Sequence, residues 1–113
     1  MTILDAQTIQ FTLGYNEPTL SADGSVLHDL KQTNIDYTKN GVPQPTVVVP
    51  ATALAGGGRI DYPLVLALAE NESATFTFTV TAEDLTGNVS TPNTLSTTVD
   101  RVAPQPVTNF TVA

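Results

Sequence analysis

Residues 74–82 read ATFTFTVTA, and this stretch decides the fold class of the chain. Alanine, phenylalanine and valine occupy the even positions and threonine occupies every odd one. Successive side chains of a strand point to opposite faces, whereas a helix would spread these apolar residues around its whole circumference. The stretch therefore predicts a half-buried β-strand whose side chains Phe76, Phe78 and Val80 face a core.

The segments around this strand predict a sheet protein. Gly87 and Asn88 follow it and tolerate positive φ, so the chain can reverse there, and residues 94–100 supply a hairpin partner. Further strand candidates, separated by glycine and proline, are residues 9–15, 33–39, 45–50 and 60–68. Short strands at such spacing predict an all-β antiparallel two-sheet sandwich of about seven strands. Its core is expected to include Leu66 as well.

Residues 64–70, LVLALAE, allow two interpretations. Leucine and alanine are good helix formers, which favours a helix. Leu64, Leu66 and Leu68 alternate, however, Pro63 precedes them, and a helix of seven residues would be short. We expect a strand.

Composition and charge restrict the partners. A chain of 113 residues is long enough for one domain. Eleven acidic residues against four basic ones give a net charge of −7, which disfavours nucleic acid and anionic membranes. The chain has no cysteine, hence no disulfide and no thiolate chemistry. It shows neither a secretory signal nor a membrane span, so we expect a polypeptide made in a cytoplasm that stays soluble.

Residues suited to catalysis or metal binding are few. His28 is the single histidine, and no GxSxG, HExxH or phosphate-binding motif accompanies it, so we predict no enzyme and no cofactor. Asp84, Asn88 and Asp100 are weak calcium candidates if they gather at one end of the sandwich, with capping of a turn as the alternative. Gly56–Gly58 is expected to be a flexible loop rather than an anion site.

Residues 15–41 read YNEPTLSADGSVLHDLKQTNIDYTKNG, and residues 80–90 read VTAEDLTGNVS. Both segments resemble fibronectin type III domains of bacterial and phage proteins. The resemblance implies an immunoglobulin-like sandwich in which Tyr15 takes the place of a core tryptophan. It also implies that Ile35 and Tyr37 take the apolar and aromatic core positions of strand C. Phe76 takes the place of a corner tyrosine and lacks its hydroxyl.

The end of the chain departs from that resemblance. Residues 100–113, DRVAPQPVTNFTVA, are similar to the linker and first strand of a following domain. We therefore divide the chain into a sandwich of residues 1–103 and a proline-rich tail of residues 104–113. Val107, Phe110 and Val112 would let the tail pair with an edge strand of another copy; alternatively the tail pairs within its own sheet or only touches a neighbour.

These features favour a non-enzymatic structural or interaction module. The resemblance implies a bacteriophage virion protein, either a capsid decoration or a tail-associated protein. Its partners would be other virion subunits or copies of itself, in a homo-oligomer or lattice. The alternative is an accessory or glycan-binding module of a secreted bacterial carbohydrate-active enzyme or adhesin, located outside the cell within a longer chain. In that case Tyr62 would be the exposed aromatic contact.

Overall fold

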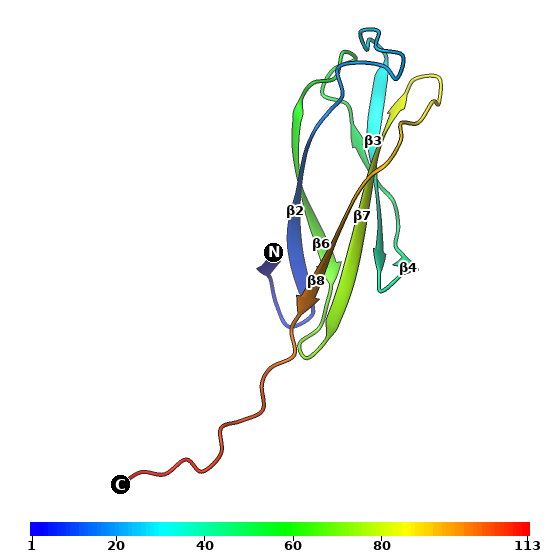
Figure 1. The fold of residues 1–113 in the computed structure, drawn as a ribbon. Helices are drawn as coiled ribbons and strands as arrows, with labels where there is room; N and C mark the ends of the chain where they lie inside the picture. The colour runs from blue at the N-terminus through cyan, green and yellow to red at the C-terminus, as the bar shows by residue number, and fades with distance from the viewer.

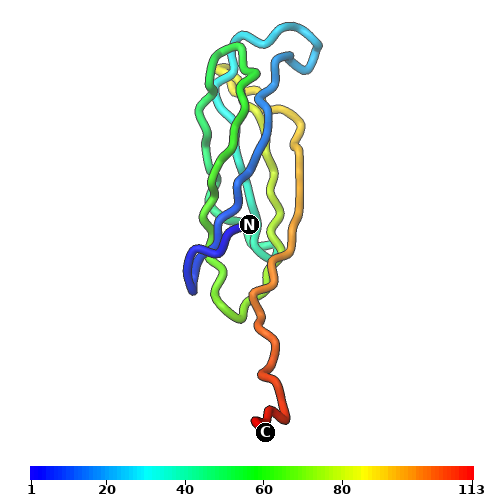
Figure 2. Tube along the Cα trace, turned by 90° about the vertical axis from the view of Figure 1, so that its left-hand side faces the viewer, coloured from blue at the N-terminus to red at the C-terminus, as the bar shows by residue number.

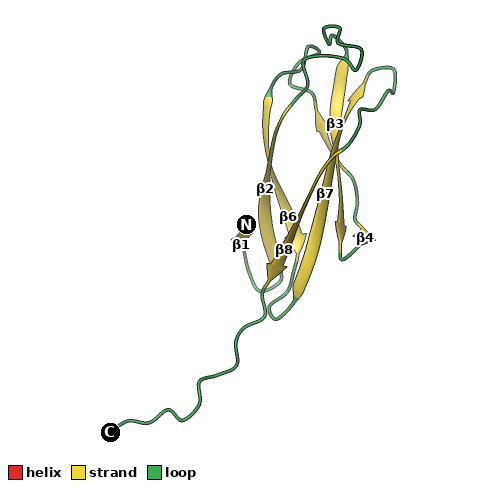
Figure 3. Ribbon diagram, in the orientation of Figure 1, coloured by secondary structure: helices red, strands yellow, loops and turns green.

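The computed structural model describes all 113 residues and contains eight strands and no helix. The strands are β1 (Thr2–Ile3), β2 (Thr8–Asn16), β3 (Leu30–Lys39), β4 (Val42–Pro43), β5 (Val47–Pro50), β6 (Arg59–Ala67), β7 (Ser73–Asp84) and β8 (Asn93–Asp100). One sheet has the order β1-β2-β6, and the other has the order β4-β3-β7-β8 with β5 also paired to β3. The two sheets face each other (Figures 1 and 3). The predicted all-β antiparallel sandwich is confirmed, and β1 and β4 add two very short strands.

The longest strand, β7, explains the alternation of residues 74–82. It pairs antiparallel with β3 on one side and β8 on the other. On its outer face the threonine hydroxyls bond across to β8, with oxygen separations of 2.9 Å for Thr75 and Thr98 and 2.9 Å for Thr77 and Ser96. Cross-strand pairs of this kind stabilise a sheet. The threonines therefore form a polar outer face that is satisfied within the sheet.

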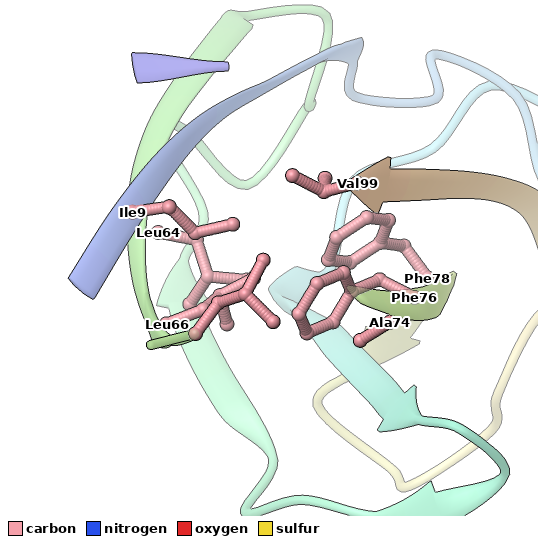
Figure 4. Packing of buried hydrophobic residues seen from close by; sticks show 8 residues of the cluster. Ile9, Leu64, Leu66, Ala74, Phe76, Phe78 and Val99 are labelled. Atoms are coloured by element: carbon pink, nitrogen blue, oxygen red, sulfur yellow. The ribbon is translucent and has the colours of Figure 1, made fainter. Parts of the chain in front are cut away.

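The inner face of β7 builds the core (Figure 4). Phe76 and Phe78 are 1% and 7% exposed. Phe11, from the facing sheet, meets them edge to face, with ring centroids 5.8 and 5.4 Å away. Such edge contacts contribute about 0.5–1.5 kcal/mol per pair beyond burial of the rings. The other buried members of this core cluster are Ile9, Leu64, Leu66, Leu68, Ala74 and Val99.

Strand β6 decides between the helix and strand interpretations of residues 64–70. It pairs with β2 along its whole length, from Thr8 opposite Ala67 to Asn16 opposite Arg59. The alternating leucines at 64, 66 and 68 are all buried. The strand prediction is confirmed as far as Ala67, and the helix alternative is wrong.

Three side chains expected in the core are only half-buried: Tyr15, Tyr37 and Val80. Tyr15 and Val80 line an opening between the sheets, where no strand covers them. Tyr37 packs against the rim of the core cluster. Ile35, by contrast, is completely buried. These positions lie on the inner face, but their burial depends on what stands opposite them.

The sandwich has two different ends (Figure 2). The loops of residues 17–29, 51–58 and 85–92 lie together at one end and are called the head loops below. Backbone bonds connect them: Leu30 N–H donates to Leu54, and Leu85 N–H donates to Asp29. Residues 101–113 form no strand and leave from the opposite end, so the molecule measures 74 × 26 × 21 Å.

Candidate interaction site

The sheets do not close along the edge between β2 and β8. This opening has a volume of about 380 Å³ and is called the β2–β8 gap; its apolar lining comes mainly from Leu13, Tyr15, Phe78, Val80 and Leu95.

Leu95 shows how open the gap is. It stands opposite Phe78 in the β7–β8 pairing, so both side chains point to the inner face. Yet Phe78 is 7% exposed and Leu95 is 76% exposed. Val99, four residues along the same face of β8, is 6% exposed because the core cluster covers it. The inner face of β8 therefore lacks a cover only in its half nearest the head loops.

The adjoining edge of β2 is also unpaired. On the side away from β6, β2 pairs with β1 only at Ile9 and Gln10. The N–H of Leu4 donates to Thr8 O at 3.1 Å, which shows that even-numbered residues of β2 direct their backbone groups to this side. The backbone groups of Thr12, Gly14 and Asn16 therefore face outwards with no strand beside them. Free edges of this kind are templates for an added strand.

Tyr15 forms the wall of the gap nearest the head loops. Its hydroxyl lies 2.6 Å from Thr33 Oγ1. Burial, aided by the negative charge of Glu17, raises the pKa of Tyr15 even though the bond to Thr33 opposes this. The hydroxyl is therefore neutral and held in place, and the ring offers a fixed apolar surface to the gap.

The tail is the second exposed apolar element. Val107, Phe110 and Val112 are 82%, 79% and 88% exposed. The last hydrogen bond along the chain runs from Ala103 N–H to Asn71 Oδ1 at 3.3 Å. Residues 104–113 therefore pair with no strand of their own sheet and extend away from the sandwich (Figure 1), which contradicts the alternative of pairing within that sheet.

Arg101 anchors the base of the tail. Its guanidinium donates to Leu68 O and, at 3.0 Å, to Asp5 O. Its backbone exchanges bonds with the 70–73 turn, from Arg101 N–H to Glu72 O and from Asn71 N–H to Arg101 O. These bonds tie Arg101, directly before the tail, to both neighbouring turns, so the base of the tail is held against the sandwich.

Glu17, which nothing in the sequence pattern singled out, organises the head loops. Its side chain is only 3% exposed. The carboxylate accepts bonds from the Thr52 hydroxyl, from Thr52 N–H at 3.0 Å and from Gly58 N–H at 3.0 Å. Burial alone would raise the pKa of Glu17, but these bonds outweigh it and hold the pKa below its ordinary value. The carboxylate is ionised and fully bonded, which makes it a structural group.

The glycine run of residues 56–58 is shaped by that carboxylate. Gly56 and Gly57 have φ of +66° and +83°, a region that glycine adopts without strain. A Cβ on Gly56 would collide with the Pro18 carbonyl oxygen, and one on Gly58 would collide with the Thr52 hydroxyl. The loop expected to be flexible is instead closely packed against Pro18 and Thr52. The one anion that it binds, through Gly58 N–H, is the carboxylate of Glu17.

The calcium candidates do not gather. Asp84 ends β7, whereas Asp100 pairs with Ser73 at the other end of that strand, about 36 Å away at the usual rise per residue. Asp84 instead caps its own turn, accepting bonds from the backbone and side chains of Thr86 and Asn88. The bonds from Asn88, followed by those from Thr86, lower the pKa of Asp84 to about 2. The hypothesis of a three-residue site is wrong because the length of β7 separates Asp100 from Asp84 and Asn88, which do lie together.

The remaining candidates lie apart from the gap. His28 is exposed, and its ring nitrogen Nδ1 lies 3.4 Å from the carbonyl of Val26. Tyr62 is half-buried and packs against the core cluster, so its ring is not a free platform for a sugar. Nowhere do three His, Cys, Asp or Glu side chains come together as ligands for a metal ion.

Comparison with family models, with curated proteins and with solved structures gave no match to the chain. None of its segments is a helix of the length and apolar character needed to cross a membrane.

Proposed function

We propose that this chain is a non-enzymatic structural module that docks on a larger protein assembly. The observation that carries the proposal is the tail: a segment without charged side chains that projects from the sandwich, exposes Val107, Phe110 and Val112, and is held at its base by Arg101. Exposed apolar side chains on a segment held away from the fold favour a protein partner that buries them.

We further propose a fibronectin type III-like sandwich as the frame of this module. Immunoglobulin-type sandwiches place strands A, B and E in one sheet and C, F and G in the other. The grouping of β1, β2 and β6 against β3, β7 and β8 supports this assignment. The sequence resemblance described above supports it too.

The assembly we propose is a bacteriophage virion, with this chain as a capsid decoration or tail-associated protein. The support is the resemblance to domains of phage proteins, together with a charge of −7 that disfavours nucleic acid as the partner. Genes for portal, capsid or tail proteins are expected beside the gene of this chain.

The test is incorporation into particles. Tagged full-length chain and a variant lacking residues 104–113 are expressed during phage growth, and purified particles are probed for the tag. The full-length chain is expected in the particles, and the shortened chain is expected to be lost from them. Particles without the full-length chain would contradict the virion proposal. Equal incorporation of both chains would contradict the role of the tail.

A further inference from the structure

We propose that the β2–β8 gap accepts the tail of a second copy of this chain as an added antiparallel strand, which links copies head to tail. This inference rests on the proposed function as an interaction module and names its partner and its acceptor site.

The gap leaves one strand position open beside β2. Strand β1 covers the edge of β2 at Ile9 and Gln10 and goes no further, although β2 continues to Asn16. The exposed inner side chain of Leu95 lies across the opening from that uncovered edge. A strand that continues the line of β1 would cover both.

The tail fits that place in one register. The β1–β2 pairing puts Ile3 opposite Ile9 and Thr2 opposite Gln10, so a strand continuing this line begins opposite Thr12. If residue 113 stands there, Val112 falls opposite Leu13 and Phe110 falls opposite Tyr15. Opposite residues of an antiparallel pair share a face, so both apolar tail side chains enter the gap.

The backbone agrees with the same register. The outward-facing groups of β2 belong to Thr12, Gly14 and Asn16, which would exchange hydrogen bonds with tail residues 113, 111 and 109. None of these three tail residues is proline. Pro104 and Pro106, which cannot donate, fall beyond the end of β2.

Charge favours this contact over others between copies. Each copy carries −7 and repels its neighbours, but residues 102–113 contain no charged side chain. The residues that line the gap contain none either. Tail and gap can therefore meet without bringing carboxylates together.

Direction identifies the donor as a second copy. The tail leaves at the end opposite the head loops and points away from β2 and β8 of its own chain (Figures 1 and 2). A strand antiparallel to β2 must enter a gap from the head-loop end. A copy stacked above that end, in the same orientation, presents its tail in this direction, and repetition gives an open head-to-tail chain.

Cross-linking tests the register, because the chain has no cysteine of its own. Residues 13 and 112 would form a non-hydrogen-bonded pair with Cα atoms about 4.5 Å apart, within the disulfide range. The double variant Leu13→Cys/Val112→Cys is expected to oxidise to a ladder of dimers, trimers and larger species. The matched control Leu13→Cys/Thr111→Cys points one cysteine to the other face and is expected to stay monomeric.

A ladder specific to position 112 supports the proposal. A cross-linked monomer would show that the tail folds back on its own chain and would overturn it. Equal ladders from both variants, or none, would overturn it as well.

A second measurement leaves the gap unaltered. Sedimentation velocity over a concentration series is expected to show reversible association of the unmodified chain. Phe110→Asp is expected to weaken it about 100-fold, the effect of losing one buried aromatic ring. Asn109→Asp adds the same charge beside it and is expected to change association less than about threefold, since its side chain faces outwards. A chain that is monomeric throughout would overturn the proposal. A chain recovered with particles but unable to self-associate would keep the proposed function and lose only this inference.

Discussion

The substitution Glu17→Gln tests whether the head loops depend on a buried carboxylate. The amide keeps the size of the side chain but replaces one acceptor oxygen by a donor. Oε1 accepts from the Thr52 hydroxyl and from Gly58 N–H, and Oε2 accepts from Thr52 N–H. A glutamine would turn its NH₂ towards at least one of these donors, and it would lose the charge that strengthens the remaining bonds.

The expected cost follows from these three bonds. Hydrogen bonds to a charged group contribute roughly 1.5–3 kcal/mol each and are not additive, so the loss is about 2–4 kcal/mol. At an unfolding entropy of about 2.1 cal/mol/K per residue, this corresponds to a fall in Tm of about 8–17 °C. Scanning calorimetry and urea unfolding followed by far-ultraviolet circular dichroism measure both quantities. Glu70→Gln is the matched control, because Glu70 is exposed and its carboxylate accepts no hydrogen bond.

The dependence on pH has a definite sign. The pKa of Glu17 is lower in the folded chain, so the carboxylate stabilises the fold above its unfolded pKa, about 4.3. That contribution is lost as the pH falls through the folded pKa. The difference between the parent chain and Glu17→Gln should therefore be constant from pH 7 to about 5 and shrink at lower pH. A difference below about 0.5 kcal/mol at pH 7, equal to that of Glu70→Gln, would refute the structural role of the carboxylate.

Three further perturbations address the glycine loop, the core and the capped turn. Gly56→Ala should destabilise the fold at least twice as much as Gly24→Ala. Gly24 also has a positive φ, but open space surrounds it, so Gly24→Ala should cost about 1–2 kcal/mol. Equal losses in urea unfolding would contradict the close packing of the Gly56 loop. Phe76→Ala should cost about 3–5 kcal/mol and Thr77→Ala, on the outer face, about 1 kcal/mol, so comparable losses would contradict the assigned faces of β7. The Asp84 carboxyl should titrate with a pKa of about 2 in ¹³C NMR, and the turn it caps should loosen only as the pH falls towards that value; titration near 4 would show that the cap does not form in solution.

The alternation of side chains was sufficient to predict the sheets. Two-residue periodicity at residues 74–82 and at Leu64, Leu66 and Leu68 reports which face a side chain lies on, and both segments are strands with those faces buried. It cannot report whether another layer covers that face. Val80 lies on the same face as Phe78 but is half-buried, because it lines the open β2–β8 gap.

The arrangement of the head loops could not be predicted from the sequence, for a different reason. A glutamate directly after a strand is normally solvated, and Glu17 is buried only because Thr52 and Gly58, 35 and 41 residues later, bring donors to it. The separation of Asp84 from Asp100 likewise depends on the length of β7. Asp84 lies at the turn of the β7–β8 hairpin, whereas Asp100 lies at the open end of that hairpin, opposite Ser73. A strand of half that length would have left them much closer together.

The open gap does not conflict with a stable fold, because the two halves of the sandwich have different structural roles. The core cluster fills the half nearest the tail, where Phe76, Leu68 and Ile9 are all at most 1% exposed. In the half nearest the head loops, β6 pairs with the backbone groups on one side of β2, and the bonds of Glu17 hold the loops together. This half therefore keeps its shape without a full core. The apolar surface around Leu95 is therefore not required for folding, and its burial would drive the association proposed above. A strand that binds there adds stability by mass action, so the Tm of the chain should rise with its concentration and the Tm of Phe110→Asp should not.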